Sequence, residues 1–468
     1  MRSSLGLVAT GLLVSMVFPI CGFAPDEAQM PNADIIVTAA PVYEPLAALR
    51  GGERFPAGAQ LMLLQAGKTE RLVPGFAATA DANISFDGKT VLFSGKQAAN
   101  DPWQIWEMAL ADHSLRRLIA GPEDAIRPYY LPAGRLVYAQ RTPQGFQLEA
   151  AGKDAPLALA SVEANAGLNL TPLSYIPANA VPADVLVDGR ILFEAAFPLG
   201  GSGKTPELFL VYSDGSGVES VRCDHGTARW GGRQLNSGDI VFTHGANLAR
   251  FTSSFAHEVQ VTAPRGEYAG AIAETGSGDW LVSVRAAAGG HYGLKLWKPG
   301  AAAMQSVLAV DGENIVEPVV VAPRTRPHHH PTGLHDWSYA NLLALDARQS
   351  RLGDLRQAPA TVQLETLDAQ GRIVVNGTAP VEADGSFFVQ VPADRPIRFA
   401  LLSDSGSVMR KEEGWIWARR GEQRICVGCH TGPERASENR VPAVLLRTTT
   451  PVDLTGAILM SRSKAGGK

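Results

Sequence analysis

The sequence has few cysteines, no excess of one charge and no long hydrophobic run. Four cysteines in 468 residues are too few for a scaffold held together by disulfides. The 42 lysines and arginines nearly balance the 46 aspartates and glutamates, which leaves a net charge of −4. Such a chain has no electrostatic reason to bind nucleic acid or an anionic membrane surface. No segment reaches the 18 consecutive apolar residues of a membrane-spanning helix, so no transmembrane span is predicted.

The composition indicates a globular protein that is rich in turns. Hydrophobic residues make up 45% of the chain and charged residues 19%, as in folded proteins. The 48 glycines and 31 prolines exceed the usual share, which argues against a helical bundle. The length allows two to four domains.

Residues 1–24 have the pattern of an export signal. Arg2 supplies the positive charge, residues 5–17 form an apolar run, and Pro19 and Gly22 break it. Cys21 is a candidate lipid anchor, although Ile20 before it is larger than the small residue that usually precedes a lipidated cysteine. We therefore predict a location in the periplasm or on the outer side of the membrane.

A glycine turn followed by a short apolar strand recurs along the first two thirds of the chain. The spacing of 40 to 55 residues, with several short strands per unit, is typical of β-propellers. We predict a six-bladed β-propeller over residues 30–323, with seven blades as the alternative. Residues 58–73 and 317–321 would share one blade and close the ring. The five turn glycines are Gly88, Gly134, Gly189, Gly238 and Gly278.

The chain changes character after the predicted propeller. Residues 324–358 contain a histidine triplet between prolines and read as a linker. Residues 359–404 alternate apolar and polar side chains between hairpin turns, which predicts a small antiparallel β-sandwich. Residues 405–468 would form a haem-binding segment. The whole chain is thus expected to be mainly β.

The haem prediction rests on the sequence Cys426-Val427-Gly428-Cys429-His430. This C-x-x-C-H pattern is typical of covalent c-type haem attachment. Two thiols three positions apart bond both vinyl groups of one haem, and the adjacent histidine is then the proximal iron ligand. We therefore predict one covalent haem c on Cys426 and Cys429, with His430 on the iron.

Two other interpretations of the motif stay open. Zinc would need a fourth ligand besides Cys426, Cys429 and His430, and His335 or Cys223 could supply it. A redox dithiol would be expected near a βαβ pattern, which the sequence lacks.

The second axial ligand decides which chemistry the haem supports. His335 is the leading candidate, and the triplet 328–330, Met409 and Met460 are alternatives. A vacant position would permit small-molecule binding. Trp415 and Trp417, two positions apart, could share one face and pack either on the porphyrin or in the core.

The C-terminal third resembles a known family. The stretches 377–387 and 391–396, followed by the motif 426–430, resemble the middle region of the hydrazine synthase alpha subunit family, and residues 85–88 resemble a TolB-type propeller repeat. The resemblance covers residues 40–445, most strongly 375–432. It implies a propeller followed by a β domain, with Cys426 and Cys429 as attachment sites and His430 as the motif histidine.

This chain departs from the family in two respects. It has no second C-x-x-C-H motif, and its last tyrosine is Tyr339. No residue therefore matches the tyrosine that ligates the active haem in the family. The resemblance implies architecture and haem binding rather than hydrazine synthesis.

Three functions remain compatible with the sequence. The first is an exported monohaem cytochrome that transfers single electrons to or from a redox partner protein, with the propeller as docking scaffold. The second is a haem enzyme with an open distal site for a small nitrogen, oxygen or sulfur species. The third is a non-redox binding module with a zinc clip. We find no hydrolase triad, phosphate loop or carboxylate pair, so whether the chain is an enzyme stays open.

Overall fold

The computed structural model describes residues 32–152, 169–196, 205–222, 227–253, 257–351, 353–429, 431, 435–436 and 438–456. The predicted export signal at 1–24, Cys21, Cys223, His430 and Met460 lie outside the described residues. Within the described part of the chain, no helix is long and apolar enough to span a membrane. Strands predominate, so the prediction of a mainly β chain is confirmed.

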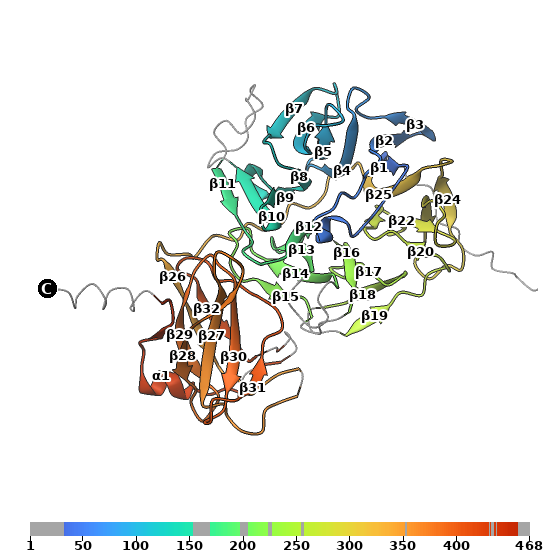
Figure 1. Ribbon diagram of the computed structural model, residues 1–468. Coiled ribbons are helices and arrows are strands. Elements are labelled where there is room, and N and C mark those ends of the chain that lie inside the picture. The colour runs from blue at the N-terminus through green and yellow to red at the C-terminus, as the bar shows by residue number, and fades with distance from the viewer. Residues whose placement is uncertain are drawn as a thin grey trace, which may run out of the picture.

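The described residues between 35 and 320 form six antiparallel sheets that lie around a common centre (Figure 1). The first sheet has the order β25-β1-β2-β3, so it joins the end of this region to its beginning. Two short 3-10 helices, Ala48–Arg50 and Pro132–Gly134, lie between strands. The strands of the first three sheets are β1 (Ile35–Ala40), β2 (Gln60–Gln65), β3 (Lys68–Arg71) and β25 (Asn314–Val320); β4 (Ala78–Ile84), β5 (Thr90–Lys96), β6 (Gln104–Ala109) and β7 (Leu115–Ile119); β8 (Ala125–Leu131), β9 (Arg135–Thr142), β10 (Gly145–Gly152) and β11 (Asn169–Pro172).

The other three sheets continue the same up-and-down order. Their strands are β12 (Asn179–Val185), β13 (Ile191–Ala196), β14 (Glu207–Val211) and β15 (Glu219–Ser220); β16 (Arg229–Gln234), β17 (Ile240–His244), β18 (Asn247–Phe251) and β19 (Glu258–Gln260); β20 (Glu267–Tyr268), β21 (Ala273–Glu274), β22 (Trp280–Arg285), β23 (Gly293–Trp297) and β24 (Gln305–Leu308).

The recurring glycine has a conformational reason. All five turn glycines have φ between 70° and 91°, the left-handed region that disfavours residues with a Cβ. Each therefore permits the tight turn before an apolar strand. This repeat places the sheets at regular intervals along the chain.

The centre of the six sheets contains buried charges. Bulges in the strands nearest the centre interrupt the register, for example between Ala80 and Asn83. Asp81, which lies in this bulge, accepts a hydrogen bond from the Arg54 guanidinium, which also bonds Glu317 at 2.5 Å. Because buried charges are costly unless they are paired, these ion pairs fix the strands around the centre.

The second part of the chain contains two sheets packed face to face. Their orders are β32-β26-β29-β33 and β28-β27-β30-β31. The second is antiparallel, whereas β26 pairs in parallel with β32, and β29 with β33. The sandwich is therefore mixed rather than antiparallel as predicted. Its elements are β26 (Tyr339–Ala344), β27 (Thr361–Leu367), β28 (Ile373–Pro380), β29 (Phe387–Pro392), β30 (Ile397–Leu402), β31 (Val408–Lys411), β32 (Gln423–Cys426), α1 (Ala443–Arg447) and β33 (Val452–Asp453).

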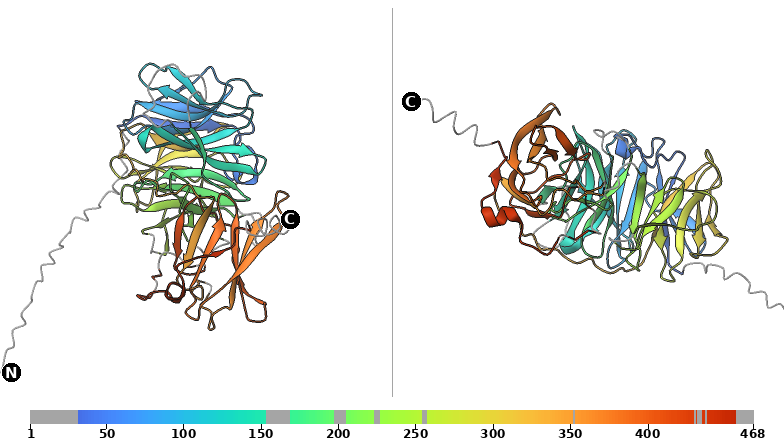
Figure 2. Two further views of the ribbon diagram at one scale, coloured as in Figure 1. Left: turned by 90° about the vertical axis from the view of Figure 1, so that its left-hand side faces the viewer. Right: turned by 90° about the horizontal axis from the view of Figure 1, so that it is seen from below.

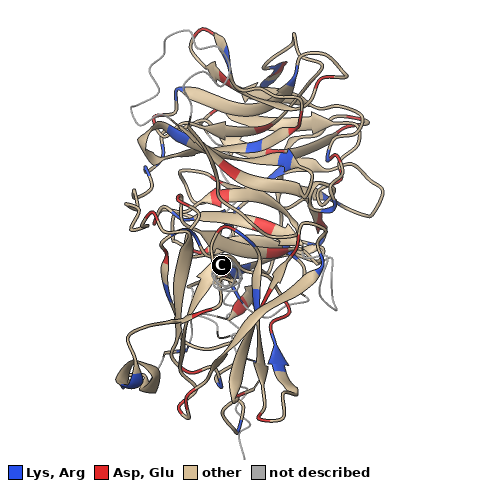
Figure 3. Ribbon diagram, turned by 60° about the vertical axis from the view of Figure 1, so that its left-hand side comes forward, with Lys and Arg blue, Asp and Glu red and all other residues tan. Residues whose placement is uncertain are grey.

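The two sheets draw strands from three predicted segments. β26 comes from the stretch predicted as linker, and β31 to β33 come from the predicted haem-binding segment. The sandwich lies beside the sheet β12–β15 (Figures 1 and 2). Acidic and basic positions are mixed over both parts (Figure 3), in keeping with the small net charge.

Candidate haem site

A cavity of about 350 Å³ lies between the sheet β12–β15 and the sandwich. This volume is within the usual range for sites that bind small molecules and cofactors. From the first part of the chain, Phe193 and Phe209 line it with rings whose centroids are 5.4 Å apart. From the sandwich side come Trp415 and Trp417. Residues far apart in the sequence thus form one largely aromatic wall.

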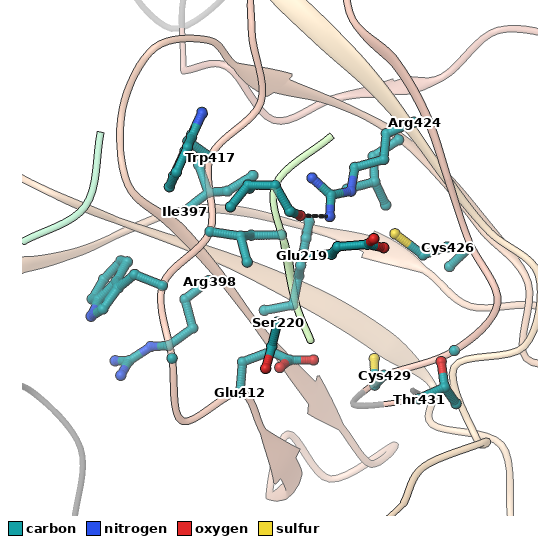
Figure 4. Close-up of a pocket in the computed structure, with 18 of the residues that line it drawn as sticks. Glu219, Ser220, Ile397, Arg398, Glu412, Trp417, Arg424, Cys426, Cys429 and Thr431 are labelled. Carbon is teal, nitrogen blue, oxygen red and sulfur yellow. Dashed lines mark hydrogen bonds between the residues drawn. The ribbon is translucent and has the colours of Figure 1, made fainter. Parts of the chain in front are cut away.

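Both motif cysteines line this cavity, and both thiols are free. Figure 4 shows the two sulfur atoms on one side of the cavity and Trp417 on the other. Cys426 ends β32, and its carbonyl accepts a hydrogen bond of 2.9 Å from the Leu345 amide. The Cys429 amide donates to the Gln349 carbonyl at 3.1 Å. These backbone bonds hold the two thiols toward the cavity.

Gly428 permits this arrangement because a larger residue would not fit. A Cβ at this position would lie 2.7 Å from the Gln349 carbonyl oxygen and 2.9 Å from that of Asp346. The motif therefore lies directly against residues 346–349. The small residue before the second cysteine has a packing role here.

The environment raises the pKa of both thiols. Burial raises the pKa of the Cys426 thiol, and the Arg424 guanidinium beside it opposes that rise. Burial raises the pKa of the Cys429 thiol well above its ordinary value, and the Glu412 carboxylate adds to this rise. Both cysteines are therefore neutral thiols in this cavity at neutral pH.

The two tryptophans belong to the core and to the cavity wall at once. Each is nearly fully buried and packs in the hydrophobic cluster of the β8–β15 strands. The Trp417 indole donates a hydrogen bond of 2.8 Å to the Gly215 carbonyl. The Arg398 guanidinium lies 4.5 Å above the Trp415 ring. The structure thus places both rings in the core, and packing on a porphyrin stays a prediction.

The donor set of the cavity fits a haem. Thiols, aromatic rings and apolar side chains line much of the space, as thioether bonds and porphyrin faces would require. Charged side chains line the rest, namely those of Glu219, Arg398, Glu412, Arg424 and Arg435. Two buried donors in this wall, Nη1 of Arg424 and Nε1 of Trp415, have no hydrogen-bond acceptor among the described residues. A ligand that brings acceptor groups would satisfy them.

Of the predicted second ligands, His335, the triplet 328–330 and Met409 are not part of the described lining of the cavity. His335 is exposed and stacks on Trp337, with ring centroids 4.7 Å apart. His330 is exposed and stacks on Tyr212 at 4.1 Å. The described lining of the cavity includes no histidine or methionine. In the described part of the chain, no group of three or more His, Cys, Asp or Glu residues is placed to hold a metal ion.

Several cavity residues were not identified from the sequence. Arg424 lies two positions before Cys426, and the shared face of residues i and i+2 on a strand could have indicated it. Glu412 comes from the loop after β31, and Glu219 and Ser220 form β15 in the first part of the chain. No sequence signal links those segments to the motif, because only the tertiary fold brings them together.

Glu365 supports this wall of the cavity from behind. Its carboxylate accepts hydrogen bonds from Arg398 at 2.6 and 3.0 Å and from Lys411 at 2.8 Å. Burial raises the pKa of the Glu365 carboxyl, but the bonds from Lys411 and Arg398 outweigh burial and lower the pKa overall. The ionised form is therefore favoured by folding.

We expect acid to weaken the sandwich through Glu365. Because the pKa is lower in the folded state, its stabilisation is complete above the unfolded value of about 4.3 and is lost as the pH falls through the folded value. Glu365→Gln should reduce the free energy of unfolding at pH 7 by about 1.5–3 kcal/mol. It should also flatten the decline of the denaturation midpoint below about pH 4. As control, Glu382→Gln breaks an exposed pair with Arg447. It should lower the free energy of unfolding by less than about 1 kcal/mol. Equal effects of both variants would contradict this prediction.

A match to a family model and a match to a solved structure both support the resemblance. The family described as "Hydrazine synthase alpha subunit middle domain" matches residues 344–431. The structure of Kuenenia stuttgartiensis hydrazine synthase is similar over 90% of this chain and 72% of that chain, with a TM-score of 0.75 and 17% identity. At this identity the similarity shows a shared fold. The resemblance of the C-terminal third to this family is thus confirmed.

Propellers of the TolB type are also among the similar structures. TolB from Acinetobacter baumannii matches over 61% of this chain and 66% of that chain, with a TM-score of 0.43 and 12% identity. A TolB-like protein from Agrobacterium tumefaciens matches over 59% and 88%, with a TM-score of 0.41 and 11% identity. No curated protein matches the chain.

Proposed function

We propose that this chain is an exported c-type haem protein that transfers single electrons. One haem is attached through Cys426 and Cys429 in the cavity between the sandwich and a six-bladed propeller, and His430 is its axial ligand. The observation that carries the proposal is that both thiols of the C-x-x-C-H motif face one aromatic cavity of suitable size. When bound, the haem supplies an Fe(III)/Fe(II) couple.

The protein's own residues set the surroundings of that couple. The rings of Phe193, Phe209 and Trp417 would give the haem an apolar wall. β32 is an edge strand, and Ile425 beside Cys426 is 67% exposed. The outer face of β32, opposite the face that carries Cys426, is therefore open to solvent, and a redox partner protein would dock there.

The proposed location follows from the sequence and from the chemistry. Residues 1–24 would direct export, and thioether formation on a C-x-x-C-H motif takes place outside the cytoplasm. The propeller would serve as docking scaffold for the partner, and Cys21 as a lipid anchor if the signal is processed there.

A second function, a haem enzyme acting on a small molecule, is favoured by polar groups in the cavity. Glu412, Glu219 and Ser220 line it among the aromatic rings (Figure 4). Carboxylates and a hydroxyl so placed can accept or deliver protons. A protein similar in fold is named hydrazine synthase, an enzyme.

The absorption spectrum of the reduced protein, with and without carbon monoxide, distinguishes the two functions. The protein should be matured in a periplasm that has haem-attachment machinery. We expect a low-spin c-type spectrum that carbon monoxide does not change, which means two axial ligands and electron transfer. A clear shift with carbon monoxide would favour the enzyme. Stoichiometric zinc without a haem band would contradict both.

His335 remains our predicted second axial ligand, and its present position makes the prediction testable. His335 stacks on Trp337 and is not among the described residues that line the cavity, so as an iron ligand it would have to adopt another position. His335→Ala should therefore open the iron to carbon monoxide, seen as a new spectral shift that the wild type lacks. An unchanged spectrum in this variant would assign the second position to another residue.

A further inference from the structure

A second cavity, of about 650 Å³, lies at the common centre of the six sheets. One strand from each sheet contributes lining residues, namely β4, β8, β12, β16, β21 and β25 (Figure 1). In β4, β12, β16 and β25 these residues are at the C-terminal end of the strand, so the cavity lies at one end of the space between the sheets. It shares no described lining residue with the candidate haem site.

The segment that follows β25 forms a further wall of this central cavity. Residues 322–325 and Pro327 line it. The Arg324 amide donates a hydrogen bond of 3.0 Å to the Phe86 carbonyl, and the His328 amide donates one of 2.9 Å to the Val187 carbonyl. The start of the predicted linker is therefore fixed to the turn after β4 and to the turn after β12.

Two arginines line the central cavity without a carboxylate partner. The Arg324 guanidinium donates from Nε and Nη2 to the Ile84 carbonyl at 3.2 Å, and from Nη2 to Oδ1 of Asn83 at 3.3 Å. The Arg233 guanidinium donates from Nη1 to the Gly232 carbonyl at 3.2 Å. All these acceptors are neutral, so no carboxylate of the described structure neutralises either cation by direct contact.

The two carboxylates that line the central cavity are bonded to the backbone. The oxygens of Asp184 accept hydrogen bonds of 2.8 Å from the Val185 and Gln234 amides, one on each oxygen. Glu274 accepts a hydrogen bond of 2.6 Å from the Asn236 amide. These bonds fix both carboxylates in the wall of the cavity, away from direct contact with the two arginines.

The surroundings of Arg324 favour an additional negative charge. Burial lowers the pKa of the Arg324 guanidinium and the charge of Arg233 lowers it further, although Asp184 opposes both. Tyr129, whose ring lies 5.2 Å below the Arg233 guanidinium, also lines the cavity. Burial raises the pKa of the Tyr129 hydroxyl, so it is a neutral group that can donate a hydrogen bond. Two cations and a neutral donor on one cavity favour an anionic ligand.

We propose that the central cavity binds a small organic carboxylate, with Arg233 and Arg324 on its anionic group. Guanidinium binds carboxylate through charge-assisted hydrogen bonds, often two at once. Ile84, Val185 and Ile272 line the same cavity and contact the carbon part of the ligand. The volume is within the usual range for small-molecule sites. This site does not depend on the proposed haem, whose cavity lies elsewhere.

The test is titration calorimetry of the full-length protein in a buffer without other oxyanions, with succinate, citrate, benzoate and inorganic phosphate as separate probes. We expect at least one of the three carboxylates to bind at one site per chain, and uncharged succinamide not to bind. Arg233→Gln and Arg324→Gln should each weaken binding about tenfold or more. Arg324→Lys, which keeps the charge without the planar fork, should weaken it less.

Arg326→Gln is the matched control, because Arg326 is exposed, lies two positions after Arg324 and is not in the described lining of the cavity. This variant should bind the carboxylate as the wild type does. The Cys426→Ala/Cys429→Ala variant should also bind it unchanged, which separates this site from the haem cavity.

Three results would overturn the inference. They are no binding of any of the three carboxylates, binding of phosphate alone, and equal affinities in Arg233→Gln, Arg324→Gln and Arg326→Gln. If circular dichroism shows that Arg324→Gln does not fold, Arg233→Gln and Arg324→Lys decide the question. Loss of carboxylate binding in the double cysteine variant would likewise contradict a site at the centre of the propeller.

Discussion

Replacing Cys426 and Cys429 by alanine is expected to abolish covalent haem binding. Both thiols line the cavity, and each would form one thioether. When both sulfur atoms are removed, any haem left in the cavity is held only by non-covalent contacts and is released on denaturation. The measurement is haem staining after a denaturing gel, together with the intact mass of the protein. Each single variant should retain one thioether and a reduced haem content.

Cys223→Ala is the matched control for this prediction. Cys223 is not part of the motif, so the variant should bind haem as the wild type does. Covalent haem in the double variant would contradict the attachment site. Loss of haem in Cys223→Ala would show that haem binding can be lost by removing a cysteine outside the motif.

Replacing Trp417 by alanine is expected to destabilise the contact between the two parts of the chain by about 3–5 kcal/mol. The indole is 1% exposed and packs near Phe193, with ring centroids 6.3 Å apart. It also donates to the Gly215 carbonyl at 2.8 Å. The substitution removes a large buried ring and leaves that carbonyl without its donor. Denaturant unfolding followed by circular dichroism measures the loss.

Trp337→Ala is the matched control, since the same substitution is made at an exposed ring. Trp337 is 39% exposed and stacks only between His335 and Tyr339 among the described rings. The Trp337→Ala substitution should lower the free energy of unfolding by less than about 1 kcal/mol. Similar costs for both tryptophans would contradict the interface role of Trp417.

The turns, the strands and the motif could be predicted from the sequence, because local chemistry determines them. Gly88 and its four counterparts marked the turns because their positive φ favours glycine there. Alternation predicted strands within residues 359–404, and β27 and β30 lie there. The motif at Cys426 was evident because the C-x-x-C-H spacing is typical of c-type haem attachment.

What the sequence could not predict depends on contacts between distant segments. The sequence predicted that residues 58–73 and 317–321 share one blade, but it did not predict β1, which lies between them and pairs with β25. The parallel pairing of β26 with β32 across most of the sandwich was not predicted either. The buried pairs of Arg54 appear as ordinary surface charges in the sequence. Likewise, Glu219 and Ser220 reach the cavity only because their sheet lies against the sandwich.

The most direct test of the account is hydrogen exchange of the matured protein compared with the Cys426→Ala/Cys429→Ala variant. The central claim is that one haem fills the cavity between the propeller and the sandwich. We therefore expect haem to slow exchange in three separate segments: β15 in the propeller, residues 412–417, and β32. Protection confined to β32 and the motif, with β15 unchanged, would contradict the claim that the propeller forms a wall of the haem site.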